Sequence, residues 1–531
     1  MLDQNLYSCF QDRRPADPGA LFLRGDRRSL AYSDLDTETG RYAAALAACG
    51  VSPGDRVVVQ VGKSVEFVLL YLACLRAGAV FVPLNPAYTR AELAYFLGDA
   101  SPRMLVCDPA AAAAHDLPAL AAETGVAHCL TLGTDGGGSL PEAAAALPPT
   151  TGVVSRGRDD LAAILYTSGT TGRSKGAMIT HGNLISNGLV LHEYWGWVPG
   201  DVLLHALPVF HVHGLFVALH CALLNGSEVI FLDAFDPARL VAELPGASVL
   251  MGVPTFYVRL LDTPGFDRSV SDGVRLFISG SAPLLPETFD QFAALTGKPI
   301  LERYGMTEAG MITSNPYAGG ERIAGTVGFA LPGVSARVAD PEGTALPAGE
   351  IGILEITGPN VFAGYWNMPE KTAEEFRADG HFITGDMATM AEDGRIAIVG
   401  RAKDLIISGG FNVYPKEVEE QLDRMPGVRE SCVIGLPHPD LGEAVTAVIV
   451  PEAGGRASGE SAGMKEGVNE GGNEGVNEAA ITAESVAAFL ADRLARFKQP
   501  RQVVLVDALP RNAMGKVQKK ALREEHAGLY G

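Results

Sequence analysis

The chain of 531 residues has few of the features of a secreted or membrane-spanning protein. Its seven cysteines are scattered singly without a CxxC pair, which argues against a disulfide framework or zinc site and favours a reducing compartment. The longest apolar stretch, residues 67–84, is broken by Arg76 and fits core elements better than a membrane span. The N-terminus lacks the basic and apolar regions of a secretory signal. We therefore expect a cytoplasmic protein with no membrane partner.

Positive charge is also scarce. The chain has 42 Lys and Arg against 62 Asp and Glu, a formal net charge of -20. This balance argues against nucleic acid as a partner, because nucleic-acid binding needs a basic surface. An anionic substrate would have to find local positive charge, so cations in glycine-rich or apolar settings are the most informative.

The length is too great for one hydrophobic core and predicts two or more domains. Strand-like runs at residues 56–61 and 228–232 alternate with helix-like runs such as 66–76, which indicates α/β layers with largely parallel sheets. A boundary is expected near residues 400–404. The later pattern predicts a smaller domain of about 130 residues, with a strand at 404–408, a helix at 415–424, and strands at 432–435 and 444–450.

Residues 452–480 have a different composition. Glycine and glutamate dominate, aromatic residues are absent, and Glu-Gly-Val-Asn-Glu occurs at 466–470 and again at 474–478. Such a segment offers no apolar face to bury. We expect a disordered surface insertion without a catalytic role.

Residues 166–176 carry the strongest functional signal, Tyr-Thr-Ser-Gly-Thr-Thr-Gly-Arg-Ser-Lys-Gly, after an apolar run at 161–165 that predicts a buried strand. Glycines let backbone N–H groups approach an anion, hydroxyls donate hydrogen bonds, and lysine supplies charge. The loop is not a Walker A motif, because Lys175 is followed by Gly176 rather than Ser or Thr. It predicts a polyphosphate site whose candidate ligands are Thr167, Ser168, Gly169, Thr170, Thr171, Gly172 and Lys175.

This loop resembles the phosphate-binding signature of the adenylate-forming superfamily, which includes acyl-CoA synthetases, peptide-synthetase adenylation domains and luciferases. The resemblance extends from about residue 20 to 525. It implies that ATP activates a carboxylate as an acyl-adenylate, with release of pyrophosphate and transfer of the acyl group to a thiol. The implied fold has a large N-terminal domain of layered α/β subdomains (1–400), a hinge (401–404) and a small mobile C-terminal α+β domain (405–531).

A second motif, Tyr304-Gly-Met-Thr-Glu308, follows Leu301-Glu-Arg303. A tyrosine can stack on adenine, a threonine can contact phosphate, and a glutamate oxygen can bind Mg²⁺. The family resemblance implies catalytic roles for Thr307 and Glu308, and Mg²⁺ ligands in Glu308 and Thr170. With the upstream loop at 279–283, it implies further ATP-binding residues at Gly280, Ser281, Ala282, Tyr304, Gly305, Met306 and Thr307.

The C-terminal part carries three more signatures of the same superfamily. Asp386, within Thr384-Gly-Asp386, and Arg401 match residues that contact the ribose or phosphate of ATP. The junction at 400–419 implies a hinge at Lys403 and close approach of Gly409 and Gly410 to the pantetheine of coenzyme A. Lys516 matches the catalytic lysine of the adenylation step, and its surroundings resemble sites modified by a protein lysine acetyltransferase.

The identity of the acid rests on residues 209–214 and 252–261, which resemble acyl-pocket segments. A fatty-acid pocket would be apolar throughout. Arg259 instead falls in an apolar helical run, where a guanidinium could hold a second carboxylate in a bidentate pair. The alternative is an arginine that points to solvent.

Several segments resemble one branch of the superfamily, the malonyl-CoA synthetases: 251–261, 276–285, 301–308, 313–317 and 495–500. This resemblance implies malonate as the substrate and Arg259 as the residue that grips its distal carboxylate. Arg303 is the second candidate for that role. The other implied pocket residues are His211, His213 and Met306.

Three alternatives remain open from the sequence. The nearest is a CoA ligase for another short, medium-chain or aryl carboxylic acid, such as methylmalonate or a short fatty acid. A peptide-synthetase module would need a carrier domain after Lys516, where only a short segment follows. A non-catalytic nucleotide-binding protein would be expected to lack Lys516 or the phosphate loop.

Overall fold

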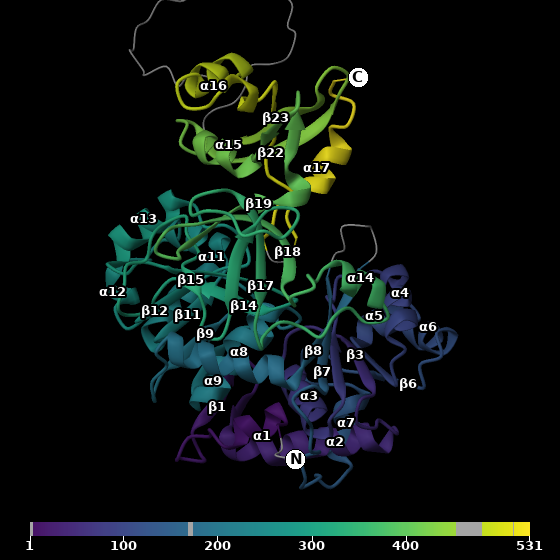
Figure 1. The fold of residues 1–531 in the computed structure, drawn as a ribbon. Coiled ribbons are helices and arrows are strands. Elements are labelled where there is room, and N and C mark those ends of the chain that lie inside the picture. The colour runs from purple at the N-terminus through teal and green to yellow at the C-terminus, as the bar shows by residue number, and fades with distance from the viewer. Residues whose placement is uncertain (1–3, 168–173, 453–480, 513–514, 531) are drawn as a thin grey trace, which may run out of the picture. The chain divides into compact units, whose positions relative to one another are not determined.

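The computed structural model describes residues 4–167, 174–452, 481–512 and 515–530 (Figure 1). Its contacts divide it into two compact units. Unit 1 contains Met1–Glu350, Leu354–Thr384 and Met390–Ala397, and unit 2 contains Ile351–Ile353, Gly385–Thr389 and Ile398–Gly531. Apart from Glu452, the expected insertion at 452–480 lies outside the described residues. No helix in the described ranges is long and apolar enough to cross a membrane.

Unit 1 contains a six-stranded sheet that carries the phosphate loop at one edge. Its order is β6-β5-β3-β4-β7-β8, parallel except for the antiparallel pairing of β7 with β8. Val58 and Leu105 on its central strands pack with Leu93 and Leu97 in a buried cluster. The strands are β3 (Arg56–Gln60), β4 (Val80–Pro83), β5 (Met104–Cys107), β6 (His128–Thr131), β7 (Leu161–Thr167) and β8 (Lys175–Thr180).

Unit 1 also contains a nine-stranded sheet. Its order is β15-β14-β13-β12-β11-β9-β10-β1-β2, with a parallel centre from β13 to β1 and antiparallel strands at both ends. The strands are β1 (Leu21–Gly25), β2 (Ser29–Ala31), β9 (Val202–His205), β10 (Glu228–Phe231), β11 (Val249–Gly252), β12 (Leu276–Ser279), β13 (Leu301–Met306), β14 (Gly310–Ser314) and β15 (Phe329–Ala330).

Helices connect the parallel strands of both sheets, as the alternating sequence pattern predicted. The helices are α1 (Leu6–Gln11), α2 (Leu35–Ala48), α3 (Val65–Ala77), α4 (Arg90–Ala100), α5 (Pro109–Ala114), α6 (Leu117–Glu123), α7 (Ser139–Ala145), α8 (His181–Tyr194), a π-helix (His213–Leu219), α9 (His220–Asn225), α10 (Pro237–Glu243), α11 (Pro254–Leu261), α12 (Arg268–Ser271), α13 (Pro286–Thr296) and α14 (Pro369–Glu374). The predicted strands at 56–61, 161–165 and 228–232 are confirmed as β3, β7 and β10, and the predicted helix at 66–76 is confirmed as α3.

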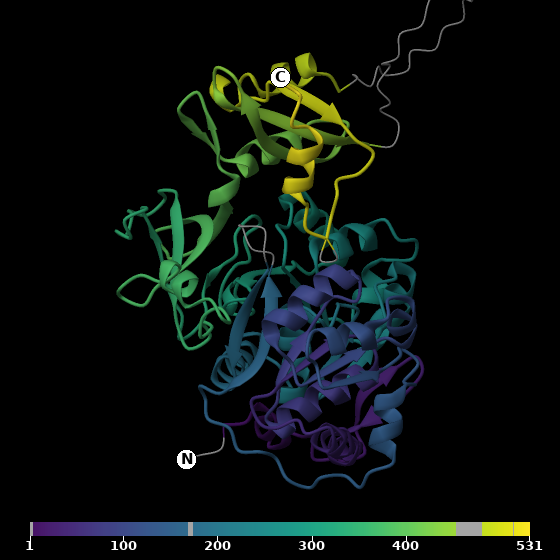
Figure 2. The ribbon, with the colours of Figure 1, turned by 90° about the vertical axis from the view of Figure 1, so that its right-hand side faces the viewer.

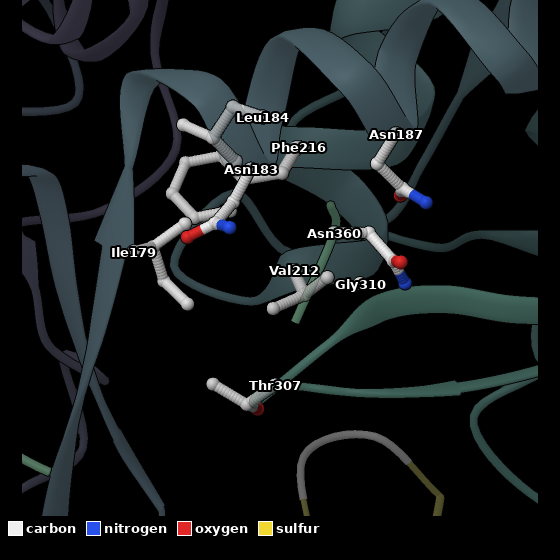
Figure 3. Close-up of a pocket in the computed structure, with 9 residues that line it drawn as sticks. All are labelled: Ile179, Asn183, Leu184, Asn187, Val212, Phe216, Thr307, Gly310 and Asn360. Carbon is white, nitrogen blue, oxygen red and sulfur yellow. The ribbon is translucent and has the colours of Figure 1, made fainter. Parts of the chain in front are cut away.

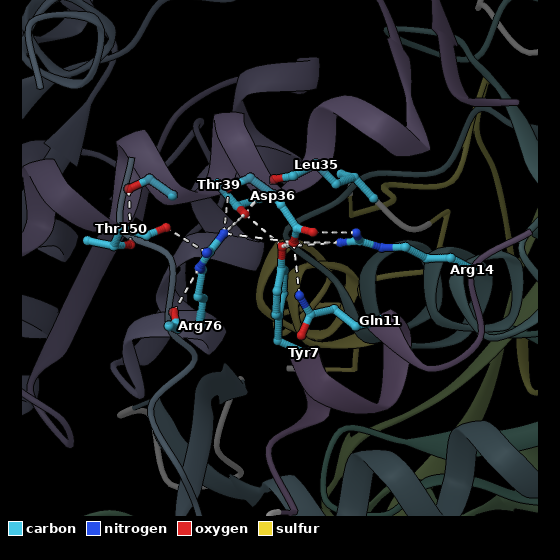
Figure 4. A network of polar contacts seen from close by, with 10 residues as sticks. Tyr7, Gln11, Arg14, Leu35, Asp36, Thr39, Arg76 and Thr150 are labelled. Carbon is cyan, nitrogen blue, oxygen red and sulfur yellow. Dashed lines mark hydrogen bonds and ion pairs between the residues drawn. The ribbon is translucent and has the colours of Figure 1, made fainter. Parts of the chain in front are cut away.

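A polar network fixes the N-terminal helix α1 against α2 and α3 (Figure 4). Arg14 forms two hydrogen bonds with the Asp36 carboxylate, at 2.7 and 2.9 Å, and Tyr7 donates to the same group at 3.0 Å. The hydrogen bonds from Arg14 lower the pKa of Asp36 to about 2. Arg76, only 2% exposed, donates to the Asp36 carbonyl at 2.6 Å and the Thr150 carbonyl at 2.6 Å. Arg76 therefore has a structural role, and its charge is not available to a substrate.

A third sheet has the order β16-β17-β18-β19, and three of its strands carry residues assigned to both units. Unit 2 itself is built on a long antiparallel pair, β22 and β23, as both ribbon views show (Figures 1 and 2). The remaining elements are β16 (Ser335–Ala339), β17 (Gly352–Thr357), β18 (Phe382–Met390), β19 (Ile396–Arg401), β20 (Ile406–Ser408), β21 (Phe411–Val413), α15 (Pro415–Leu422), β22 (Val428–His438), β23 (Gly442–Pro451), α16 (Ala483–Leu490), β24 (Gln502–Leu505) and α17 (Lys519–Glu525).

Alternation along β22 builds two separate cores in unit 2. Val433 packs with Val418 and Leu422 of α15, whereas Cys432 and Ile434 pack with Leu522 of α17. Successive strand residues point to opposite faces, so one strand can serve both cores. The predicted strand at 404–408 begins only at Ile406, because residues 402–404 form a 3₁₀ turn.

Candidate active site

The phosphate-loop motif joins β7 to β8, which pair directly at Thr167 and Lys175. The predicted ligands Ser168, Gly169, Thr170, Thr171 and Gly172 lie outside the described residues. Tyr95 donates a hydrogen bond of 2.7 Å to the Ser174 carbonyl and so anchors the C-terminal end of the loop. Glycine in general allows backbone N–H groups to approach an anion closely, so the position of this motif between two strands suits the phosphate role expected from the sequence.

Both described ends of the loop contact acidic side chains. The Thr167 hydroxyl lies 3.4 Å from Glu308 Oε1, and Lys175 Nζ lies 2.8 Å from Glu375 Oε1. Lys175 and Glu308 are 8% and 6% exposed. The structure therefore brings together Thr167 and Glu308, two residues that the sequence assigns separately to the ATP site, and adds Glu375, which the sequence did not suggest.

The second motif forms the end of β13 and a turn into β14. Gly305 allows this turn to close, because a Cβ there would lie 2.1 Å from the Gly310 carbonyl oxygen. Asn187 of α8 donates to the Met311 carbonyl at 2.8 Å and accepts from the Met311 N–H at 3.0 Å. Asn360 donates to the Ala309 carbonyl at 2.7 Å. These amides hold Thr307 and Glu308 in place without using either side chain.

A small cavity of about 20 Å³ lies beside Thr307 (Figure 3). That volume suits one water molecule. The Oδ1 atom of Asn360, which lines the cavity, has no hydrogen-bond partner within the described ranges. The remaining lining residues are Ile179, Asn183, Leu184, Asn187, Val212, Phe216 and Gly310.

The predicted adenine loop, Gly280 to Ala282, follows β12 directly. Ser281 has a φ of +73°, a conformation that costs a non-glycine residue energy and often marks a functional site. A Cβ on Gly280 would lie 2.4 Å from the Arg303 guanidinium. Glycine at 280 therefore allows the Arg303 guanidinium to approach this loop closely.

Arg303 is a buried cation beside this loop. It is 2% exposed, and its Nε and Nη2 atoms have no hydrogen-bond partner among the described residues. Burial lowers the pKa of Arg303 to about 9, so the guanidinium remains charged at neutral pH. A buried cation without partners is costly unless an anion joins it.

His213 and Ser281 complete a polar cluster around Arg303. The Ser281 hydroxyl lies 3.2 Å from His213 Nδ1, and His213 Nε2 has no hydrogen-bond partner within the described part. Burial, followed by the charge of Arg303, holds the pKa of His213 well below its usual value, so the ring is neutral. His211 accepts a hydrogen bond of 3.3 Å from the His213 N–H and supports the turn that precedes the π-helix. This cluster can receive a small carboxylate.

Arg259 occupies a different environment. It lies on the exposed side of α11, next to Val258, which is 42% exposed, while Phe256, Tyr257 and Leu260 are buried. Its guanidinium lies 5.8 Å from the ring centroid of Phe235. The prediction of a role for Arg259 in acid binding stays a prediction, but Arg303 has the burial that this role requires.

Unit 2 holds the remaining predicted residues. Arg401 Nε lies 2.7 Å from Asp386 Oδ1, so the two predicted nucleotide contacts form an ion pair. Lys403 lies in the 3₁₀ turn at 402–404. Gly409 and Gly410 form the two-residue turn of the β20–β21 hairpin with φ values of +59° and +82°. Positive φ at both positions is the geometry of a type I′ turn, which explains the glycine pair without a ligand.

Lys516 lies shortly after residues 513–514, which are outside the described part. Its N–H donates to Asn512 Oδ1 at 3.0 Å, and its carbonyl accepts from the Asn512 N–H at 2.9 Å. Gly515 has a φ of +73°, which glycine adopts readily. The backbone at Lys516 is thus fixed from both sides.

Two family models match the chain. An AMP-binding enzyme model covers residues 10–366, and an AMP-binding enzyme C-terminal domain model covers residues 417–516. The chain belongs to the AMP-binding enzyme family. This membership confirms the predicted adenylate-forming fold, with its large N-terminal and small C-terminal parts.

Relatives of this AMP-binding enzyme act on different acids. It is 36% identical to a feruloyl-CoA synthase of Amycolatopsis sp over 98% of this chain and 99% of the relative. It is 35% identical to a malonate–CoA ligase of Arabidopsis thaliana over 93% of this chain and 82% of the relative. The ATP-bound structure of MatB from Rhodopseudomonas palustris shares 51% identity, with a TM-score of 0.92 and full coverage of both chains.

Proposed function

We propose that this AMP-binding enzyme joins malonate to coenzyme A: malonate + ATP + CoA → malonyl-CoA + AMP + pyrophosphate. The observation that carries the choice of acid is Arg303, a buried guanidinium with two nitrogens unpartnered in the described structure. Malonate carries a second carboxylate that a feruloyl group lacks. A bidentate guanidinium–carboxylate pair would satisfy Arg303, and the neutral His213 would add a hydrogen bond.

In this proposal one carboxylate of malonate attacks the α-phosphate of ATP while Arg303 holds the other. Lys516, as the family resemblance implies, would stabilise the negative charge that develops between carboxylate and phosphate. The CoA thiol then attacks malonyl-adenylate and releases AMP. The residues from Thr167 to Lys175 would hold the leaving pyrophosphate, and Asp386 and Arg401 would contact the ribose.

Mg²⁺ is part of the proposal. Glu308 offers carboxylate oxygens beside the Thr167 hydroxyl, a set of hard donors that suits this ion. No cluster of three or more His, Cys, Asp or Glu side chains suited to a metal occurs among the described residues. Nucleotide-bound Mg²⁺ needs only one or two protein carboxylates, because phosphate oxygens and waters complete its shell. When bound, the ion would neutralise phosphate charge, with Glu308 and Thr170 as its protein ligands.

The test is pyrophosphate release over a panel of malonate, methylmalonate, butyrate and ferulate with ATP and Mg²⁺. Malonate should give the highest kcat/KM. The second candidate, an aryl-CoA ligase, is favoured by the 36% identity to feruloyl-CoA synthase and predicts that ferulate exceeds malonate. Cytoplasmic localisation and acetylation of Lys516 remain part of the proposal, supported by cysteine usage and by the sequence around Lys516.

A further inference from the structure

Four side chains form a chain of contacts from the phosphate loop to the second motif. Lys175 Nζ lies 2.8 Å from Glu375 Oε1, and the Tyr365 hydroxyl lies 2.6 Å from Glu375 Oε2. The same hydroxyl lies 3.1 Å from Glu308 Oε1. Lys175 Nζ also lies 4.0 Å above the Tyr365 ring. Tyr365 thus connects the lysine of one motif with the carboxylate of the other.

The backbone holds Tyr365 firmly at this position. Tyr365 forms a β-bridge with Ala177 of β8, and the Trp366 N–H donates to the Gly176 carbonyl at 2.7 Å. On the other side, the Phe362 N–H donates to the Glu308 carbonyl at 2.8 Å. Tyr365 is 2% exposed. The segment 362–366 therefore connects the backbone of β8 with the backbone at Glu308. Tyr365 is held in place by these backbone contacts as well as by its side chain.

The single hydroxyl proton of Tyr365 cannot serve both Glu308 and Glu375 equally. A phenol carries one proton, so it cannot donate fully to two ionised carboxylates. Hydrogen bonds from Lys175 and Tyr365 outweigh burial and lower the pKa of Glu375, which is therefore ionised. Tyr365 makes its shorter contact with Glu375 and its longer contact with Glu308. An ionised carboxylate offers about four lone-pair sites, so Glu308 can be oriented by Tyr365 and also bind a cation through an oxygen.

We propose that Tyr365 and Glu375 are positioning residues that orient Glu308 toward nucleotide-bound Mg²⁺ and fix Lys175 at the end of the phosphate loop. Neither residue needs to touch the reacting atoms. The inference rests on the proposed use of ATP and Mg²⁺, but it is independent of which acid is activated. Groups that orient a metal ligand commonly change metal affinity or activity by about 10–100-fold when removed.

The test compares Tyr365→Phe with wild type in the full-length protein by calorimetric titration of ATP, once with Mg²⁺ and once with EDTA. The variant keeps the ring over Lys175 and loses only the hydroxyl. MgATP affinity should fall about 10-fold, while affinity for metal-free ATP changes little. Because the titration contains no acid, it gives a result even if malonate is not the substrate.

Two further variants make the result specific. Tyr32→Phe removes another buried tyrosine hydroxyl, which donates to the Ser227 carbonyl at 2.9 Å, and should leave both affinities unchanged. Glu375→Gln keeps an acceptor for Tyr365 but removes the charge opposite Lys175, and should also weaken MgATP. Equal weakening of ATP with and without Mg²⁺ in Tyr365→Phe, or no change in either, would overturn the proposal.

Discussion

Arg303→Leu should separate binding of the acid from stability of the fold. Arg303 is buried, and burial lowers its pKa to about 9, so the unliganded protein holds a charge that its surroundings do not satisfy. Truncating one member of a buried charge pair costs about 2–5 kcal/mol in binding. At about 1.36 kcal/mol per tenfold, kcat/KM for malonate should fall about 30- to 5,000-fold.

The same substitution should leave the free protein at least as stable as wild type. A folded-state pKa of about 9, below the ordinary value of 12.5, means that the charged form is destabilised by folding at every pH below 9. Leucine removes that penalty, and functional sites often carry such a cost. The melting temperature of Arg303→Leu without ligand should therefore equal or exceed that of wild type.

The assay is pyrophosphate release with malonate and with butyrate, together with melting curves in the presence and absence of malonate and ATP. Arg259→Leu is the matched control, because it makes the same replacement on the exposed face of α11. It should retain most malonate activity. A large malonate-specific loss in Arg259→Leu, or an equal loss for both acids accompanied by lower stability in Arg303→Leu, would refute the assignment.

Three further changes test other parts of the structure. Asp423→Asn should stabilise the protein by up to about 4 kcal/mol at pH 8 and by less at pH 5. Burial raises the pKa of Asp423 to about 7, so its charged form costs stability progressively above pH 4, as calorimetric unfolding at both pH values can show. Lys516→Ala should reduce adenylation roughly 10²–10³-fold and spare thioester formation from supplied malonyl-adenylate; equal loss in both assays would contradict its role. Gly280→Ala should reduce malonate kcat/KM more than butyrate kcat/KM, because its Cβ would lie 2.4 Å from the Arg303 guanidinium; an equal effect on both acids would argue against this.

Much of the fold could be predicted because local pattern and tertiary environment agree. The apolar run at 161–165 is the buried part of β7, and the helical run at 66–76 lies within α3, whose Ser64 cap accepts from the Phe67 N–H. The predicted ends of helices and strands were less accurate where a short turn precedes the element. The strand expected from residue 404 starts at Ile406, because a 3₁₀ turn precedes it.

The site was only partly predictable, since some of its contacts join residues far apart in the chain. The loop and the Tyr304–Glu308 motif are contiguous in sequence, and their residue types indicate phosphate and metal chemistry. Glu375, by contrast, is 200 residues from its partner Lys175. Neither a lone glutamate after a helix nor a tyrosine before a tryptophan carries a local signal for that contact.

A motif match alone could not decide whether Arg259 or Arg303 binds the second carboxylate. Both lie in segments that resemble acyl-pocket or adenylate motifs, Arg259 in an apolar helical run and Arg303 between Glu302 and Tyr304. On α11, with its 3.6-residue period, Arg259 falls on the exposed side while its neighbours Phe256 and Leu260 are buried. Arg303 lies on β13, which pairs parallel with β12 and antiparallel with β14, and its side chain is buried. A cation retained there must meet an anion or destabilise the protein, and that requirement favours Arg303 as the residue that selects a dicarboxylate.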